Sequence, residues 1–133
     1  MAKSIERVFT KSVPLYDWAT IRLVLTSDVK KSSSKRGFKD PATARTIFEG
    51  KGIFTIILRN RPTINDIAHE SVHVAMQILH VSGVRFNAIT FCGQRTKNDE
   101  ALGYLVGFIA AWISTRLRKN RHRLTPRLAG KHG

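Results

Sequence analysis

The segment from Pro62 to Leu79 constrains the fold more than any other part of this 133-residue chain. Thr63 followed three residues later by Asp66 approximates a helix capping box, and Pro62 disfavours an earlier helix start. Gly83 supplies a stop signal. Apolar residues then recur at spacings of three and four, which predicts a helix packed along one side; they are Ile64, Ile67, Ala68, Ala75, Ile78 and Leu79.

This predicted helix carries the pattern His-Glu-x-x-His at His69, Glu70 and His73. Histidines four residues apart lie on one helix face, about 6 Å apart along the axis, so both imidazoles can reach one metal ion. Glu70 projects about 100° away, close enough to hold a metal-bound water. A second interpretation stays open, in which the histidines are half-buried helix residues and Glu70 faces solvent.

A catalytic zinc ion takes three protein ligands and keeps a fourth position for water, so the histidine pair needs a third partner. The candidates are His80, Asp99 and Glu100. His80 lies two helical turns beyond His73, about 10 Å further along the axis, too far for a metal bond near 2 Å. Glu100 opens an apolar segment that ends at Ile113 and predicts a second, buried helix. There it either serves as the third ligand or complements the helix dipole.

Tyr104 lies one helical turn after Glu100. Its hydroxyl is predicted either at the metal site, where it orients Glu100 or stabilises an oxyanion, or in the core with a satisfied hydrogen bond. Both tryptophans, Trp18 and Trp112, are expected to pack in the core. Tyr104 is therefore the aromatic residue that we associate with the site.

Two short motifs stand in a fixed order along the chain: His69-Glu70-x-x-His73, then Glu100-Ala101-x-x-Tyr104-Leu105-x-Gly107. This order resembles the glutamate-type zincins, a family of metallopeptidases, and more closely small metallopeptidase-like proteins encoded by bacteriophages. The resemblance runs from residue 50 to residue 113. It implies a minimal zincin-like domain in which His69, His73 and Glu100 hold Zn²⁺, Glu70 is the general base, and an edge strand before the helix aligns a peptide. The chain departs from the larger members in lacking a later His or Asp signature for a transition-state stabiliser.

Apolar and β-branched runs predict strands at residues 21–25 and 53–58. Residues 44–48 and the turn 49–52 would form a hairpin with the second of these strands. With 42% hydrophobic residues the chain can build one modest core. We therefore predict a single α+β domain over residues 1–115, with a small mixed sheet, the His-Glu-x-x-His helix and the second buried helix.

The net charge is +14, and the cations are unevenly placed. We predict a flexible basic tail over residues 116–133 and a second flexible cationic stretch around Ser32–Ser34. The basic residues of the two stretches are Arg116, Arg118, Lys119, Arg121 and Arg123, and Lys30, Lys31, Lys35 and Arg36. Such segments attract polyanions through counterion release, which predicts nucleic acid or an acidic protein surface as partner. A role in solubility alone is the other interpretation.

The single cysteine, Cys92, excludes an internal disulfide framework, and the N-terminus lacks a signal-peptide pattern. We therefore expect a cytoplasmic location, the host cytoplasm for a phage protein, and no transmembrane segment. The leading hypothesis is a zinc-dependent metallopeptidase-like protein that cleaves a peptide bond with Glu70 as general base. The alternative is a non-catalytic basic module on the same scaffold that binds nucleic acid or a host or phage protein. The sequence leaves the substrate and the oligomeric state open.

Overall fold

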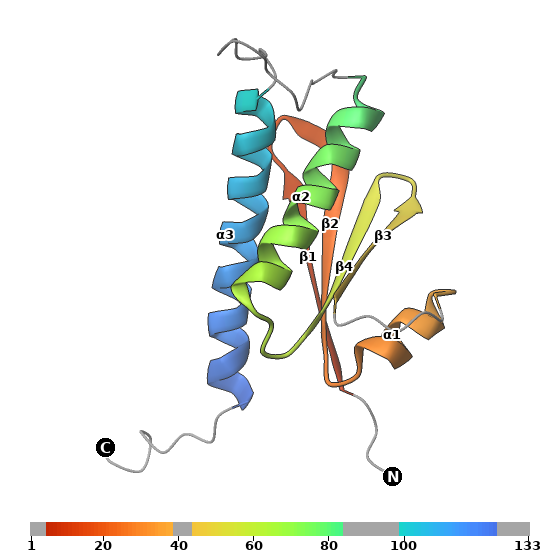
Figure 1. The fold of residues 1–133 in the computed structure, drawn as a ribbon, viewed down its shortest axis with the longest axis vertical. Helices are drawn as coiled ribbons and strands as arrows, with labels where there is room; N and C mark the ends of the chain where they lie inside the picture. Colours follow the sequence, from red (N-terminus) through yellow and green to blue (C-terminus); the bar gives the residue numbers. More distant parts are fainter. Residues whose placement is uncertain (1–4, 39–43, 84–98, 125–133) are drawn as a thin grey trace.

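A computed structural model describes residues 5–38, 44–83 and 99–124, without the side chains of Asp99 and of residues 121–124. The described part forms a four-stranded sheet with three helices (Figure 1). In chain order the elements are β1 (Glu6–Val13), β2 (Tyr16–Thr26), α1 (Val29–Lys35), β3 (Ala44–Gly50), β4 (Ile53–Arg59), α2 (Ile64–Val81) and α3 (Asp99–Leu124). The predicted α+β class is confirmed.

The sheet is mixed and has the strand order β1-β2-β4-β3. Strands β1 and β2 pair antiparallel, β2 and β4 pair parallel, and β3 and β4 pair antiparallel. The second half of β2 and most of β4 are buried, which explains why the sequence shows dense apolar runs there. The strands predicted at residues 21–25 and 53–58 are confirmed within these two elements.

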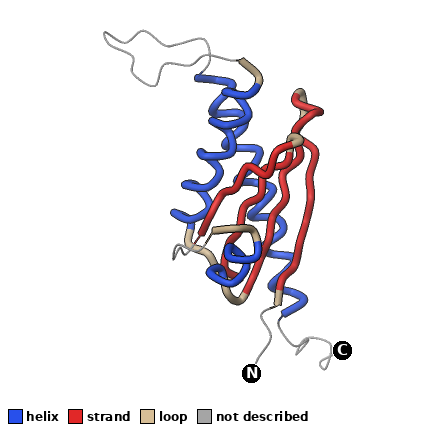
Figure 2. The backbone as a smooth tube through the Cα atoms, turned by 90° about the vertical axis from the view of Figure 1, so that its right-hand side faces the viewer, coloured by secondary structure: helices blue, strands red, loops and turns tan. Residues whose placement is uncertain are grey.

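Helices α2 and α3 pack antiparallel on one face of the sheet, and α1 covers part of the other (Figures 1 and 2). Side chains alternate between the two faces along each strand, so each central strand contributes to both layers. The larger core lies under α2 and α3 and includes Ile21, Leu23, Leu25, Phe54, Ile56, Leu58, Val74, Ile78, Leu105, Ile109 and Ile113. The smaller core lies under α1 and consists of Val24, Val29, Ile47 and Ile57.

The predicted hairpin between β3 and β4 is confirmed, and its turn depends on two glycines. Gly50 and Gly52 adopt φ values of +83° and +76°, which glycine reaches without steric cost. A Cβ at Gly52 would also collide with the main-chain carbonyl of Trp18. The turn therefore fixes where β3 ends and β4 begins.

Helix α2 begins as the sequence predicts, with Thr63 as its N-cap. The Thr63 hydroxyl accepts a hydrogen bond from the Asp66 main-chain N–H at 3.0 Å, and the Asp66 carboxylate accepts one from the Thr63 N–H at 3.0 Å. The helix ends at Val81, and Gly83 follows with a φ of +78°. This local closure fixes the start of the helix two turns before the histidine pair.

The structure has helices in two stretches that the sequence analysis predicts to be flexible. The prediction for the serine-rich segment is wrong, because Asp28 caps helix α1 by accepting a hydrogen bond from the Lys31 N–H at 3.0 Å. The buried Ser32 hydroxyl also donates to Thr26 Oγ1 at 2.9 Å. In the basic segment that begins at residue 116, helix α3 continues to Leu124.

None of the helices in the described ranges is both long and apolar enough to cross a membrane.

Candidate metal centre

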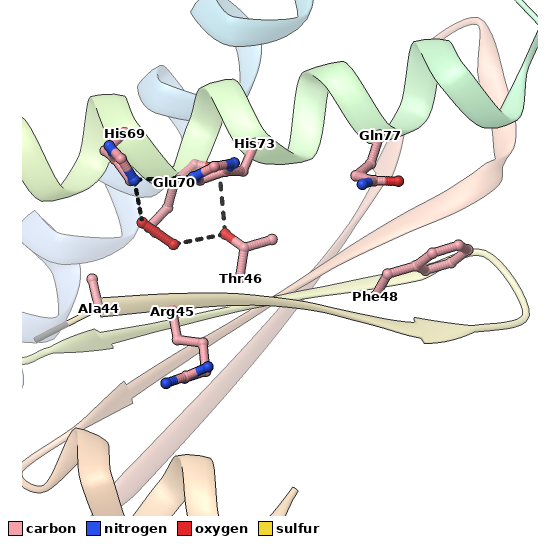
Figure 3. Close-up of a pocket in the computed structure, with 8 residues that line it drawn as sticks. All are labelled: Ala44, Arg45, Thr46, Phe48, His69, Glu70, His73 and Gln77. Atoms are coloured by element: carbon pink, nitrogen blue, oxygen red, sulfur yellow. Dashed lines mark hydrogen bonds and ion pairs between the residues drawn. The ribbon is translucent and has the colours of Figure 1, made fainter. Parts of the chain in front are cut away.

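His69 and His73 project from the same face of α2, as their spacing predicts. Their Nε2 atoms lie 3.0 Å apart, and the rings meet edge to face. Two imidazole nitrogens bound to one tetrahedral zinc ion at about 2.0–2.1 Å would be separated by about 3.3–3.4 Å. The pair therefore needs a shift of only a few tenths of an ångström to chelate an ion (Figure 3).

Glu70 is buried between α2 and the sheet, with 5% of its surface exposed. Its Oε1 accepts a hydrogen bond from the Thr46 hydroxyl of β3 at 3.0 Å, and its Oε2 lies 3.9 Å from His69 Nε2. The interpretation that places Glu70 on the solvent side of the helix is therefore wrong. The side chain points toward the strand, and its carboxylate lies beside the histidine pair (Figure 3).

The surroundings of the Glu70 carboxylate contain little to balance a negative charge. In the described part of the chain its polar contacts are the Thr46 hydroxyl and His69, and neither lysine nor arginine lies within ion-pair distance of it. A cation bound at the two histidines would interact favourably with this buried carboxylate.

A pocket of about 370 Å³ opens between β3 and α2 around these groups (Figure 3). Every second residue of β3 faces α2 across this pocket, namely Ala44, Thr46 and Phe48, because strand side chains alternate. The helix contributes residues four apart, namely His69, His73 and Gln77, together with Glu70. Arg45 completes the lining from the neighbouring position on the strand. The pocket is therefore a groove along an edge strand, with the histidines near one end.

Among the described residues, one group of three potential ligands has its ligand atoms within 4.8 Å of one another: His69, Glu70 and His73. Glu100 is exposed in the first turn of α3, beside the C-terminal end of α2 (Figure 1). Helix α2 rises about 12 Å between His73 and that end. The structure therefore does not bring Glu100 to the histidine pair, and its role as a ligand stays a prediction.

Two other residues weighed at the sequence level also lie away from the pocket. Tyr104 is half exposed on α3 and does not line the groove. His80 is exposed in the last turn of α2, where helix geometry predicts it. The neighbours that the sequence analysis missed are Thr46, Phe48 and Gln77. The alternation within the predicted hairpin strand identifies which side chains share a face, but the strand's position beside α2 is a tertiary feature.

Asp66 anchors the start of α2 before the site. Burial alone would raise the pKa of its carboxyl, but hydrogen bonds from the Thr63 N–H and hydroxyl, with the nearby Arg59 guanidinium, outweigh that effect and lower it. Arg59 Nη2 lies 3.3 Å from Asp66 Oδ2. The end of β4 is therefore tied to the first turn of α2, which limits how the histidine-bearing face can rotate.

The chain matches no protein-family model, no curated protein and no solved structure at a significant level. Its site must therefore be interpreted from its own geometry. That geometry brings two imidazoles and one carboxylate within 4.8 Å of one another, a group that could bind a metal ion.

Proposed function

We propose that this chain is a zinc-dependent peptidase in which His69 and His73 are two of the ligands of the ion and Glu70 is the general base. The observation that carries the proposal is the buried Glu70 carboxylate, which lies beside two histidine nitrogens 3.0 Å apart. Two neutral imidazoles suit zinc, and Glu70 supplies a base within the same small volume. The resemblance of the motif order to zincins supports the same assignment.

Bound zinc would supply Lewis acidity, which lowers the pKa of a water and polarises a carbonyl. Glu70 would then take a proton from the water as its oxygen bonds to the peptide carbonyl carbon. The Thr46 hydroxyl occupies Oε1, so Oε2, which lies 3.9 Å from His69 Nε2, is the oxygen available for that proton. When the C–N bond breaks, Glu70 would return the proton to the leaving amine.

The position of β3 favours a peptide substrate. This strand is at the edge of the sheet and pairs with β4 alone, and its side chains that face α2 line the groove. An extended peptide can add to such an edge through main-chain hydrogen bonds, which gives affinity for a backbone of any sequence. A peptide lying along β3 would bring a carbonyl past His69, His73 and Glu70.

Metal analysis tests whether the protein binds zinc through the proposed histidine ligands. Protein purified without added zinc is analysed for metal as wild type, as His73→Ala and as His80→Ala, which removes a histidine of the same helix outside the pocket. We expect about one equivalent in wild type and in His80→Ala, and less than about a tenth in His73→Ala. Equal zinc content in all three proteins would contradict the assignment of the ligands.

A peptide-cleavage assay tests whether Glu70 is the general base. Glu70→Gln keeps the shape and the Thr46 hydrogen bond of the side chain but cannot accept a proton. We expect it to retain zinc and to lose peptide cleavage by at least about 100-fold, the size of a general-base contribution. Loss of zinc along with activity would instead make Glu70 a ligand, and unchanged activity would exclude it as the base.

A second candidate function is nucleic-acid binding, favoured by the arrangement of the basic residues. The exposed residues Lys30, Lys31 and Lys35 lie on α1, and the exposed Arg118 and Lys119 lie near the end of α3. Both elements are in the half of the molecule away from the C-terminal end of α2 (Figures 1 and 2). Two of the other predicted partner residues already have contacts within the protein: Arg36 with Glu6, and Arg116 with the Phe9 ring.

A salt titration with a short DNA duplex tests this second function. Replacing Arg118 and Lys119 by alanine should reduce the slope of log affinity against log salt by about 0.9 for each lost phosphate contact. The side chains of Arg121 and Arg123 lie outside the described residues, so the variant leaves them in place. An unchanged slope would leave those two positions without a role in binding.

A further inference from the structure

The groove beside β3 has an aromatic end. Along the strand, Thr46 lies at the level of Glu70, and Phe48 lies two residues further on, opposite Gln77 of α2 (Figure 3). Two strand residues span about 6.6–6.8 Å. The Phe48 ring therefore lies one side-chain position along the groove from the proposed reacting centre.

The Phe48 ring is exposed and yet held in place. Its exposed fraction is 45%, although it stacks on the fully buried Phe54 with ring centroids 4.7 Å apart and planes 8° from parallel. Trp18 meets the same Phe54 ring edge to face at 5.9 Å. Trp18 itself is 41% exposed, so the expectation that it packs in the core is wrong. Phe48 thus presents one flat apolar face to the groove, backed by two further aromatic rings.

We infer that Phe48 forms an apolar subsite for a substrate side chain, two residues to the N-terminal side of the residue that faces Thr46. This inference rests on the proposed peptidase function. A peptide that pairs antiparallel with β3 runs from the Phe48 end toward the Ala44 end, so residues before the cleaved bond pass Phe48. Antiparallel pairing is the more frequent and slightly more stable of the two arrangements.

The chemistry of the subsite specifies its ligand. A flat aromatic face gains most from burying another aromatic ring or a large aliphatic side chain, and least from a carboxylate. A single well-placed apolar contact of this kind changes kcat/KM by about 10- to 100-fold. The substrate class is therefore an extended peptide with an aromatic or large aliphatic residue upstream of the cleavage site.

Mapped cleavage sites test the inference. The probe is the peptide mixture from a tryptic digest of a denatured bacterial proteome, cleaved by wild type, Phe48→Ser, Phe48→Leu and the exposed control Val8→Thr on β1. We expect enrichment of Phe, Tyr, Leu and Met on the N-terminal side of the cut for wild type and for Val8→Thr. Phe48→Ser should lose the enrichment while keeping its zinc, and Phe48→Leu should keep it for aliphatic residues.

The outcomes separate this inference from the proposed function. Cleavage by wild type without apolar enrichment, or with the same enrichment in Phe48→Ser, overturns the subsite and leaves the peptidase standing. Enrichment on the C-terminal side of the cut overturns the antiparallel orientation. Absence of any cleavage that depends on Glu70 overturns the peptidase and the subsite together.

Discussion

The two edge strands of the sheet differ in the helix side chains that lie next to them. Strands β1 and β3 are both edge strands, of 8 and 7 residues, and each pairs antiparallel with its single neighbour. At the β1 edge, Arg116 of α3 lies over the Phe9 ring at 5.2 Å. At the β3 edge, α2 directs two histidines and a buried glutamate toward the strand. The two strands are alike in length and pairing, so the adjacent helix decides which edge carries a site.

This contrast has a physical meaning for edge strands in general. An edge strand leaves main-chain donors and acceptors unpaired, which is a liability in a free protein and an asset in a protein that binds peptides. At β1, the Arg116 guanidinium covers the Phe9 ring on the face turned toward α3. A groove of about 370 Å³ along β3 leaves room beside that strand. The predictions below test whether chemistry is confined to the β3 edge.

Thr46→Val should give the largest effect among variants that leave the ligands and the base itself intact. It removes the hydroxyl that holds Glu70 Oε1, so we expect kcat to fall about tenfold with zinc content unchanged. Thr10→Val, an exposed threonine on β1, is the matched control and should retain full activity. A pH profile shifted in Thr46→Val alone would confirm that the hydroxyl acts on the base. Equal kcat in both variants would contradict it.

Asp66→Asn should weaken the start of α2 by about 1 kcal/mol. The pKa of the Asp66 carboxyl is lowered in the folded protein, so its contribution is present above the unfolded pKa and is lost as pH falls through the folded pKa. Chemical denaturation of wild type and variant should therefore show a gap in unfolding free energy at pH 7 that closes in the acid range below about pH 4. A gap that persists at pH 2 would show that Asp66 acts through something other than its charge.

Arg116→Ala removes the guanidinium that lies over the Phe9 ring of β1. Loss of the cation–π contact with Phe9 should lower the unfolding free energy by about 0.5–1 kcal/mol. Because this edge carries none of the proposed ligands, zinc content and cleavage should remain at wild-type values. A loss of activity beyond the loss of folded protein would contradict the separation of the two edges.

Glu100→Gln should have the smallest effect. Since Glu100 lies beside the far end of α2, we expect zinc content within error of wild type. The zinc content of His73→Ala, measured in the same experiment, shows how large the loss is when a ligand is removed. A comparable loss of zinc would restore Glu100 as the third ligand and would require α3 to approach the pair more closely than it does in this structure.

The parts of the site that the sequence predicts are those with a local cause. The capping box at Thr63 and the spacing of His69 and His73 depend on residues within one helix, so both were predictable. Thr46 precedes Glu70 by 24 positions, and no local pattern connects them. Likewise, the apolar residues of α3 predict that it packs, but not which of its ends lies beside the C-terminal end of α2.

The same limit explains the two elements that the pattern missed. Strand β1 places its two central apolar residues, Val8 and Phe9, next to each other between charged and polar residues, so it shows no clear alternation and gives a weak signal. Helix α1 contains three consecutive serines, which normally favour turns. Its stability comes from the Asp28 cap and from Val29 packed beneath it, and the second of these depends on the finished sheet.

The hydrogen bond between Thr46 and Glu70 joins a strand to a helix, and this makes two equilibria depend on each other. The hydroxyl that orients the carboxylate belongs to the strand along which a peptide would lie. Any ligand that holds β3 in the position seen here therefore favours the orientation of Glu70, and by reciprocity the oriented carboxylate raises the affinity of the strand for that ligand by the same free energy. Ligand binding in the groove and the orientation of the Glu70 carboxylate are then thermodynamically coupled, so a change in one shifts the other.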